Sequence, residues 1–180
     1  MSTDDRPPDT DLSVARTPGD EAGQTVSTTD YRDAISRFLT GVSVVSSRHA
    51  GIAHGITASA VASVTLEPPT VLVCLNRQSA TGHAVKACGH FVINVLNDSQ
   101  HALAKHFASK LEDKFAGIEH DTGVLGDPLL PNALAQLECR VSSQADVGSH
   151  HVFFGEVIKI QVRDGAPLAY FRGRFIPPQA

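Results

Sequence analysis

Short runs of β-branched and other apolar residues, separated by turn-forming residues, recur along the chain from Val42 onward. They predict strands over 42–47, 53–65, 70–76, 91–96, 133–147, 150–164 and 167–175. Three segments, 31–39, 80–88 and 98–109, have the apolar spacing of a helix instead. Because strands and helices do not alternate regularly, a doubly wound parallel sheet is disfavoured. The pattern predicts a mostly antiparallel β-barrel with a few short helices around it.

Turn and capping residues set the expected boundaries of these elements. Asp30 is the expected N-cap of the first helix, and Asp98 or Ser99 that of the third. The Pro68-Pro69 pair separates two strands, since proline cannot donate to a strand ladder. Asp164-Gly165 predicts a tight hairpin between the last two strands.

Length and charge exclude several classes of protein. The 180 residues are typical of one domain. The net charge is -4 and the dense charge runs are acidic, so nucleic acid is not an expected partner. No apolar run approaches the roughly 20 residues that span a bilayer, so no membrane contact is expected. Three cysteines without a CxxC pair are typical of free thiols, which favours a cytoplasmic protein.

The first 28 residues differ in composition from the rest of the chain. They are polar, acidic and rich in proline, glycine and threonine, without the apolar core of a secretory signal. Such a segment cannot bury enough apolar surface to offset the entropy of folding. We therefore expect a disordered tail over 1–28 and one folded domain over 29–180.

A strand built from small residues is the main functional signal. Residues 57–60 read TASA, and large side chains would fill a core better. Small side chains let a flat ring approach the backbone, so this strand is interpreted as the wall of a planar, phosphorylated cofactor. Close downstream, Arg77, Ser79 and Thr81 stand at a helix start, where free N–H groups and the helix dipole favour a phosphate. Simple helix capping, with Arg77 in solvent, is the competing interpretation of those three residues.

Other chemistries find less support in the sequence. GxGxxG after a strand, GxxxxGK[ST], GxSxG and HExxH are all absent from the chain. His101 and His106 point to different helix faces, and His150 and His151 to opposite sheet faces, so no metal site is predicted. Residue types alone do not exclude a Ser-His-Asp hydrolase. Cys139 lies in an apolar strand and is interpreted as a core residue rather than a nucleophile.

Four segments then appear in order between Tyr31 and Phe175, with consistent spacing. They read GITASAVASVTLEPPTVLVCLNRQSATGHAVKACGHFVINVL, LAKHFASKLEDKF, DPLLPNALAQLECRV and GSHHVFFGEV. Together they resemble the flavin reductase-like family, and within it the small reductase components of two-component flavin-dependent monooxygenases. The resemblance covers nearly the whole expected domain.

The resemblance implies a split β-barrel that forms a homodimer and binds FMN or FAD. NADH or NADPH would reduce this flavin, which then serves a separate monooxygenase. His150 matches the histidine of the family's GDH motif, which faces the nicotinamide, and is the implied catalytic residue. The implied cofactor-binding residues are Thr57, Ala58, Ser59 and Ala60 at the isoalloxazine ring, Asn76, Arg77, Ser79, Ala80 and Thr81 at the ribityl phosphate, Phe107, Ala108, Ser109 and Lys114 near the flavin, and Tyr170 and Arg172 in the closing strand.

The chain departs from this family at one position. Its GDH motif is Gly148-Ser149-His150, with a serine in place of the acid. The leading hypothesis is an NAD(P)H:flavin oxidoreductase, and Ser149 is the main argument for its alternative, a flavin-binding protein without reductase activity. An FMN-dependent oxidase of the same barrel type is a third reading, for which the chain carries no distinguishing motif.

Overall fold

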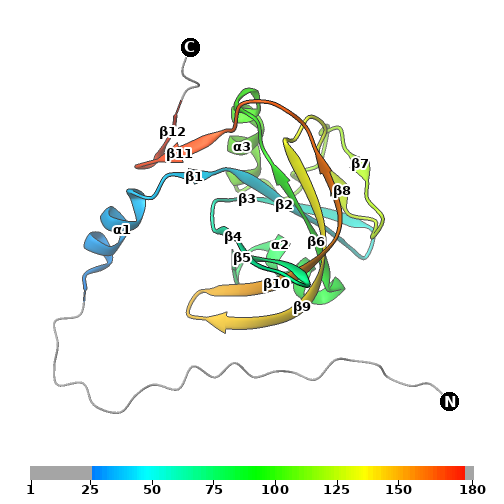
Figure 1. Ribbon diagram of the computed structural model, residues 1–180, viewed down its shortest axis with the longest axis horizontal. Helices are drawn as coiled ribbons and strands as arrows, with labels where there is room; N and C mark the ends of the chain where they lie inside the picture. Colours follow the sequence, from blue (N-terminus) through cyan, green and yellow to red (C-terminus); the bar gives the residue numbers. More distant parts are fainter. Residues whose placement is uncertain (1–25, 177–180) are drawn as a thin grey trace.

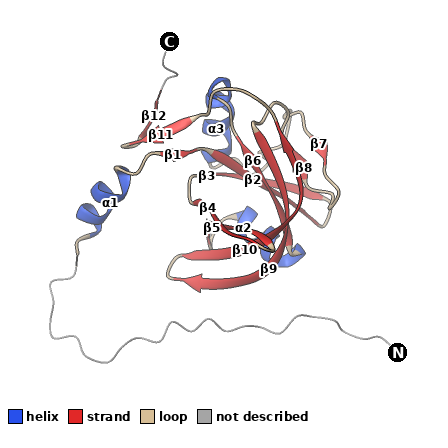
Figure 2. Ribbon diagram, in the orientation of Figure 1, coloured by secondary structure: helices blue, strands red, loops and turns tan. Residues whose placement is uncertain are grey.

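A computed structural model describes residues 26–176 of the protein. Seven strands form one antiparallel sheet in the order β3-β2-β6-β9-β10-β5-β4 (Figures 1 and 2). Their bounds are Ser43–His49 (β2), Ile52–Ala58 (β3), Val61–Leu66 (β4), Pro69–Asn76 (β5), His90–Val95 (β6), Ala135–Val147 (β9) and His150–Val162 (β10). The predicted mostly β fold is confirmed.

The two ends of this sheet, β3 and β4, are consecutive in the chain (Figure 1). The chain bends between them at Ser59 and Ala60, and the Cys74 N–H donates to the Ala60 carbonyl at 3.0 Å. The sequence predicted a single strand over 53–65, which is wrong at this bend. A curled sheet needs a corner where its edges meet, and small residues turn such a corner most easily.

A second, three-stranded sheet has the order β1-β11-β12. It contains Thr40–Gly41 (β1), Ala169–Phe171 (β11) and Arg174–Ile176 (β12). The predicted strand over 167–175 is therefore a hairpin. Its two-residue turn is Arg172-Gly173, whose φ angles of 49° and 78° suit a type I′ turn.

The hairpin predicted at Asp164-Gly165 is wrong. β10 pairs with β9 over its whole length and with β5 over His150–Glu156, and β11 pairs with neither edge of it. β11 pairs with β1 instead. A further short pair, Asp121–Thr122 (β7) with Pro128–Leu129 (β8), lies between β6 and β9 in the chain.

Three helices and a short 3-10 turn surround the sheets, with bounds Thr28–Ser36 (α1), Ala80–Cys88 (α2), Asp98–Gln100 (η1) and His101–Ala108 (α3). α2 begins and ends as predicted. The caps predicted for the other two helices are wrong: Ser27 caps α1, and Asn97 caps η1 ahead of α3. Asp30 and Asp98 lie inside the first turn instead, where a carboxylate still favours the positive end of the helix dipole.

Two buried clusters hold these elements together. The first fills the inside of the curled sheet with Val45, Val73, Leu75, Phe91 and Phe153. Cys139 belongs to it, and burial raises the pKa of its thiol to about 12, so the interpretation as a core residue is confirmed.

The second cluster lies between the barrel, α3 and the small sheet, and contains Val44, Leu96, Phe107, Phe115, Leu130 and Leu168. Gly55 on β3 lets Phe107 pack closely, because a Cβ at Gly55 would lie 2.5 Å from the Phe107 ring. α3 is thereby held directly against β3.

The N-terminal part of the domain is less buried. α1 buries none of its residues and projects from the barrel in Figure 1. Of the tail expected to be disordered, residues 1–25 lie outside the described residues.

Candidate functional site

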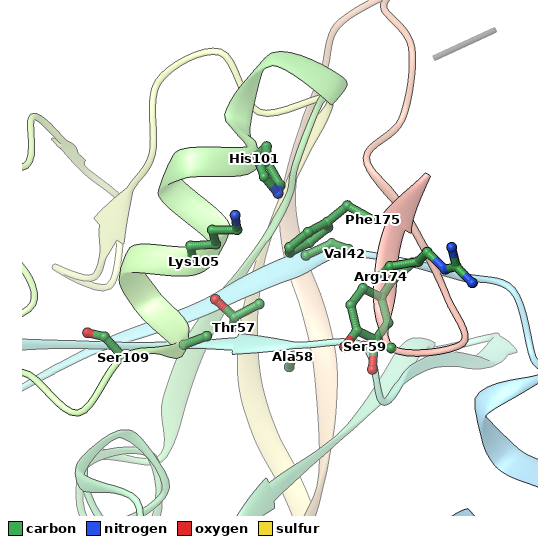
Figure 3. Close-up of a pocket in the computed structure, with 12 residues that line it drawn as sticks. Val42, Thr57, Ala58, Ser59, His101, Lys105, Ser109, Arg174 and Phe175 are labelled. Carbon is green, nitrogen blue, oxygen red and sulfur yellow. The ribbon is translucent and has the colours of Figure 1, made fainter. Parts of the chain in front are cut away.

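Two cavities lie along β3. The larger has a volume of about 690 Å³, and residues 57–59 of β3 line it. Figure 3 shows α3 on one side of this cavity and the β11–β12 hairpin on the other. The smaller cavity, of about 480 Å³, is lined by residues 54–56 of the same strand. Both volumes fall in the range of roughly 300–1,000 Å³ that is typical of small-molecule sites.

The end of α3 joins the two cavities. Ala108 and Ser109 line both of them. Thr57 fastens the helix to the strand, because its hydroxyl donates to the Ala104 carbonyl at 2.6 Å. We call the combined space the β3 trough: its floor is residues 54–59, and its sides come from residues 76–81, 101–114 and 170–175. The small residues of β3 thus line an open space, as the sequence predicted.

A helix start forms one side of the smaller cavity. Ser79 caps α2: its hydroxyl accepts from the Gly82 N–H at 3.0 Å and donates to the Asn76 carbonyl at 2.7 Å. A Cβ at Gly82 would lie 2.8 Å from that hydroxyl, so this tight cap requires a glycine there. Asn76, Ser79, Ala80 and Thr81 all line the cavity. Capping by Ser79 is confirmed, and phosphate binding stays a prediction for residues that also border a cavity of suitable size.

Two lysines stand across the smaller cavity from this helix start. Lys110 and Lys114 line it together with Glu112. The Lys114 ammonium donates to the Phe107 carbonyl at 2.8 Å, and partial burial lowers the pKa of Lys114. Burial, with a smaller contribution from His49, also lowers the pKa of His54 on the floor. A phosphate would meet cationic and N–H donors in this cavity.

Arg77 does not line either cavity, although its neighbours Asn76 and Gln78 do. Its guanidinium lies 3.8 Å from a carboxylate oxygen of Asp146, and half of the side chain is exposed. In the ligand-free protein Arg77 therefore faces an acid at the tip of the β9–β10 hairpin, rather than the place expected for a phosphate.

His150 stands at that same hairpin tip. It begins β10 directly across from Asn76, and the Ser149 carbonyl accepts from the Arg77 N–H at 2.9 Å. His150 is exposed and lies outside both cavity linings, next to the helix start. The Ser149 hydroxyl lies 3.0 Å from His150 Nδ1, so the serine that replaces the family's acid contacts the imidazole.

The next residue, His151, anchors the hairpin tip. Its ring is buried, packs on Phe153, and forms a short contact from Nδ1 to Asp146. Lys86 lies 3.5 Å from the other oxygen of that carboxylate. The hydrogen bond from His151, followed by the charges of His151, Lys86 and Arg77, lowers the pKa of Asp146. These contacts tie the hairpin to α2 and to the loop that carries Arg77.

The remaining expected site residues fall into two groups. Ala58, Ser59 and Tyr170 line the larger cavity. Phe107 is fully buried under α3, and Arg172 occupies the β11–β12 turn, where its N–H donates to the Ser36 carbonyl at 2.8 Å. Neither Phe107 nor Arg172 lines a cavity, and Ala60 lies at the strand bend beyond the lining.

Several cavity residues were not anticipated from the sequence: His101, Lys105, Arg174 and Phe175 in the larger cavity, and His54, Gln78 and Lys110 in the smaller. A signal for two of them was present. His101 and Lys105 are four residues apart on α3, so they share the helix face that also carries Ala108.

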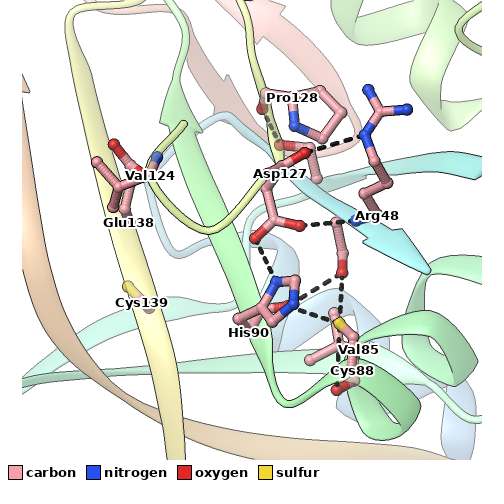
Figure 4. Close-up of polar contacts among 12 residues, drawn as sticks. Arg48, Val85, Cys88, His90, Val124, Asp127, Pro128, Glu138 and Cys139 are labelled. Carbon is pink, nitrogen blue, oxygen red and sulfur yellow. Dashed lines mark hydrogen bonds and ion pairs between the residues drawn. The ribbon is translucent and has the colours of Figure 1, made fainter. Parts of the chain in front are cut away.

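A second aspartate–histidine pair lies away from the trough (Figure 4). Asp127 is fully buried, lies 2.7 Å from His90 Nδ1 and accepts from the Arg48 N–H at 2.7 Å. Burial raises the pKa of Asp127, although the contacts with His90 and Arg48 oppose the rise. Nearby, the buried Glu138 accepts from the Val124 N–H at 2.6 Å. These bonds fasten the loop before β8 to the barrel.

Comparisons with known proteins agree with this arrangement. The flavin reductase like domain matches residues 35–177. The reductase component of 4-nitrophenol 4-monooxygenase/4-nitrocatechol 2-monooxygenase from Rhodococcus opacus is 42% identical over 81% of this chain and 78% of its own length. An FMN reductase (NADH) from Stutzerimonas stutzeri is 39% identical over 81% of this chain and 84% of its own.

The fold is also similar to that of solved flavin reductases. One is an NADH:FAD oxidoreductase from Streptomyces globisporus in complex with NAD and FAD fragments. It superposes with a TM-score of 0.80 and 31% identity, over 87% of this chain and 98% of its own. Within residues 26–176, no group of three or more metal-binding side chains is present. The same residues contain no helix long and apolar enough to cross a membrane.

Proposed function

The chain belongs to the flavin reductase-like family, and we propose that it serves as the reductase component of a two-component flavin-dependent monooxygenase. It is an NAD(P)H-dependent flavin reductase, which oxidises a reduced nicotinamide and reduces FMN or FAD. The observation that carries the proposal is the β3 trough: one open space with a phosphate-type cradle at one end and a small-residue floor at the other.

The two cavities fit two parts of a flavin. The smaller offers N–H groups at the start of α2, with Lys110 and Lys114 opposite, and this set suits the ribityl phosphate. The larger has a floor of residues 57–59 and an aromatic wall of Tyr170 and Phe175, which suits the flat isoalloxazine ring. Ala108 and Ser109, shared by both cavities, would then lie along the ribityl chain.

A flavin held in the trough would supply the hydride acceptor, and a reduced nicotinamide would supply the hydride. The residues of this chain supply position rather than a reacting group. β3 and the β11–β12 hairpin hold the ring plane, and the α2 start holds the phosphate. His150, at the rim next to Asn76, orients the nicotinamide from the side of the hairpin tip. No side-chain base is required, because no proton has to leave a carbon atom.

The alternative, a flavin-binding protein without reductase activity, rested on Ser149. The Ser149 hydroxyl is within hydrogen-bond distance of His150, so it can fix the imidazole as an acid would, although without a charge. This contact favours the reductase over the passive binder.

The homodimer is also part of this proposal. Large apolar side chains are exposed on α1 and just after it: Tyr31 (60%), Ile35 (47%), Phe38 (68%) and Leu39 (65%). On β10, Ile158, Ile160 and Val162 are exposed as well. A second copy covering these surfaces would explain an α1 that buries nothing within one subunit. Together with three free cysteines, the proposal includes a cytoplasmic location.

Stopped-flow mixing tests the reductase directly. Added FMN and FAD should each be monitored for reduction by NADH and by NADPH, with release of the reduced flavin to a monooxygenase as the second readout. His150→Ala should lower the specificity constant for the nicotinamide about tenfold, or roughly 1.4 kcal/mol, with flavin affinity near that of wild type. A wild-type protein that binds flavin but oxidises neither nicotinamide would be a passive binder.

A further inference from the structure

The larger cavity has an unbalanced charge. His101 and Lys105 line it from α3, and Arg174 lines it from β12. None of its twelve lining residues is acidic. Among residues 26–176, none of these three side chains takes part in an ion pair. Because like charges around a cavity repel, an anion placed among them would relieve that repulsion.

The ammonium of Lys105, the guanidinium of Arg174 and the imidazole of His101 lie around the aromatic wall. His101 and Lys105 lie one helical turn apart, and Figure 3 shows both side chains extending from α3 toward the space next to Phe175. The His101 ring meets the edge of Phe175, with centroids 4.4 Å apart, and Phe175 packs in the same manner on Tyr170. Arg174, next in sequence to Phe175, lines the cavity from the same hairpin, and its guanidinium extends outward in Figure 3.

The flavin phosphate does not account for these cations. In the proposed arrangement this phosphate lies in the smaller cavity, beyond Ala108 and Ser109, with Lys110 and Lys114 of its own. The oxidised isoalloxazine ring, expected over residues 57–59, carries no charge. NAD(P)H, however, brings a second anion, the pyrophosphate that joins its reactive half to adenosine. FAD does not, because one of its two phosphates is the ribityl phosphate itself, which keeps its pyrophosphate at the smaller cavity.

We propose that His101, Lys105 and Arg174 form an anion subsite that binds the pyrophosphate of NAD(P)H at the rim of the larger cavity. The proposal rests on the flavin placement given above. Lys105 and Arg174 contribute charge and hydrogen-bond donors, and His101 contributes a ring N–H. FAD serves as an internal control, because its pyrophosphate begins at the ribityl phosphate in the smaller cavity.

The test compares matched pairs of ligands without turnover. Lys105→Gln and Arg174→Gln are titrated by calorimetry with NAD⁺ and with nicotinamide riboside, which lacks the pyrophosphate. FAD and FMN are titrated by fluorescence quenching. Each substitution should weaken binding of NAD⁺ about five- to tenfold relative to nicotinamide riboside, the scale of one charged hydrogen bond. The ratio of FAD affinity to FMN affinity should not change.

Arg140→Gln is the matched control, since it removes an exposed cation that lines neither cavity. It should leave both ratios unchanged, and melting temperatures verify that all variants fold. If the ratio of NAD⁺ affinity to nicotinamide riboside affinity does not change in the Lys105 and Arg174 variants, or if the ratio of FAD to FMN affinity changes as much, the proposal is wrong. Because these are equilibrium measurements, a protein that fails to oxidise any nicotinamide would refute the proposed function and still decide the subsite.

Discussion

Two aspartate–histidine pairs use the same two side chains in opposite ways. Asp127 is fully buried with His90 partly exposed, and the pair fastens a loop to β6 away from the trough. In the other pair the histidine, His151, is buried, and the acid, Asp146, is 38% exposed at a hairpin tip beside the trough. Burial dominates at the first and raises the pKa of Asp127, whereas the contact with His151 dominates at the second and lowers that of Asp146.

The difference indicates what each pair is for. A buried acid with two donors leaves both donors unsatisfied when it is removed, so its main effect is on folding. An exposed acid that faces Arg77, Lys86 and His151 contributes little to folding but sets the charge beside a ligand site. The first pair is structural, and the second is expected to act on binding.

The largest expected effect is on the buried pair. Asp127→Ala should lower the free energy of unfolding by about 3 kcal/mol or more, because Arg48 N–H and His90 lose their acceptor inside the protein. Asp146→Ala should cost less than about 1 kcal/mol. Denaturant unfolding of both variants measures the contrast, with Asp33→Ala as an exposed ion-pair control. If both variants lost the same free energy of unfolding, the distinction between a structural pair and a pair that acts on binding would fail.

A pH series should separate the pairs by sign. The lowered pKa of Asp146 means that its stabilising contribution is present above the usual aspartate pKa of about 4 and is lost as pH falls through the lower folded value. The raised pKa of Asp127 has the reverse effect: its contribution is full below about pH 4 and declines as pH rises through the higher folded value.

The difference in free energy of unfolding between wild type and Asp146→Asn should therefore shrink as the pH falls. The corresponding difference between wild type and Asp127→Asn should widen. Urea midpoints measured between pH 3 and 7, roughly the range in which carboxyl groups titrate, test both signs. If both differences in free energy of unfolding changed in the same direction with pH, the opposite environments described for the two acids would be contradicted.

The smallest effect concerns ligand affinity. Asp146→Asn removes the charge that faces Arg77 across 3.8 Å, so the guanidinium is freed for a nearby phosphate. FMN binding should tighten about two- to threefold, within the range of a surface ion pair, and riboflavin binding should not change. Adding Arg77→Gln should abolish the gain. A loss of affinity for both ligands would show instead that Asp146 only shapes the hairpin.

Sequence patterns predicted the elements of this fold better than their connections. The alternation and capping around Ser79 predicted α2 with its correct bounds, because local chemistry decides a helix start. Asp164-Gly165 was misread, because the turn signal is local, whereas β11 pairs with β1, which is distant in the sequence. The bend at Ser59-Ala60 likewise follows from closure of the whole sheet.

The site shows the same division. The family motif placed residues 57–59, Asn76, Ser79 and Thr81 at the cavities, since they lie on elements with regular geometry. It could not place the Arg77 guanidinium, which lies next to Asp146, some 70 residues later in the chain. Nor did it reveal Arg174, which faces the larger cavity only because the last strand folds back as a hairpin.

One side of the trough belongs to the separate three-stranded sheet and not to the barrel. Tyr170 and Phe175 stand on β11 and β12, which pair with each other and with β1 but with no strand of the seven-stranded barrel among the described residues. Substitutions in this hairpin can reshape the ring cavity without shifting the register of the barrel or the start of α2. Protein engineers who wish to change which cofactor the enzyme accepts have there a wall whose strand pairing is separate from the barrel, with the packing of Tyr170 and Phe175 on the second buried cluster as the constraint to keep.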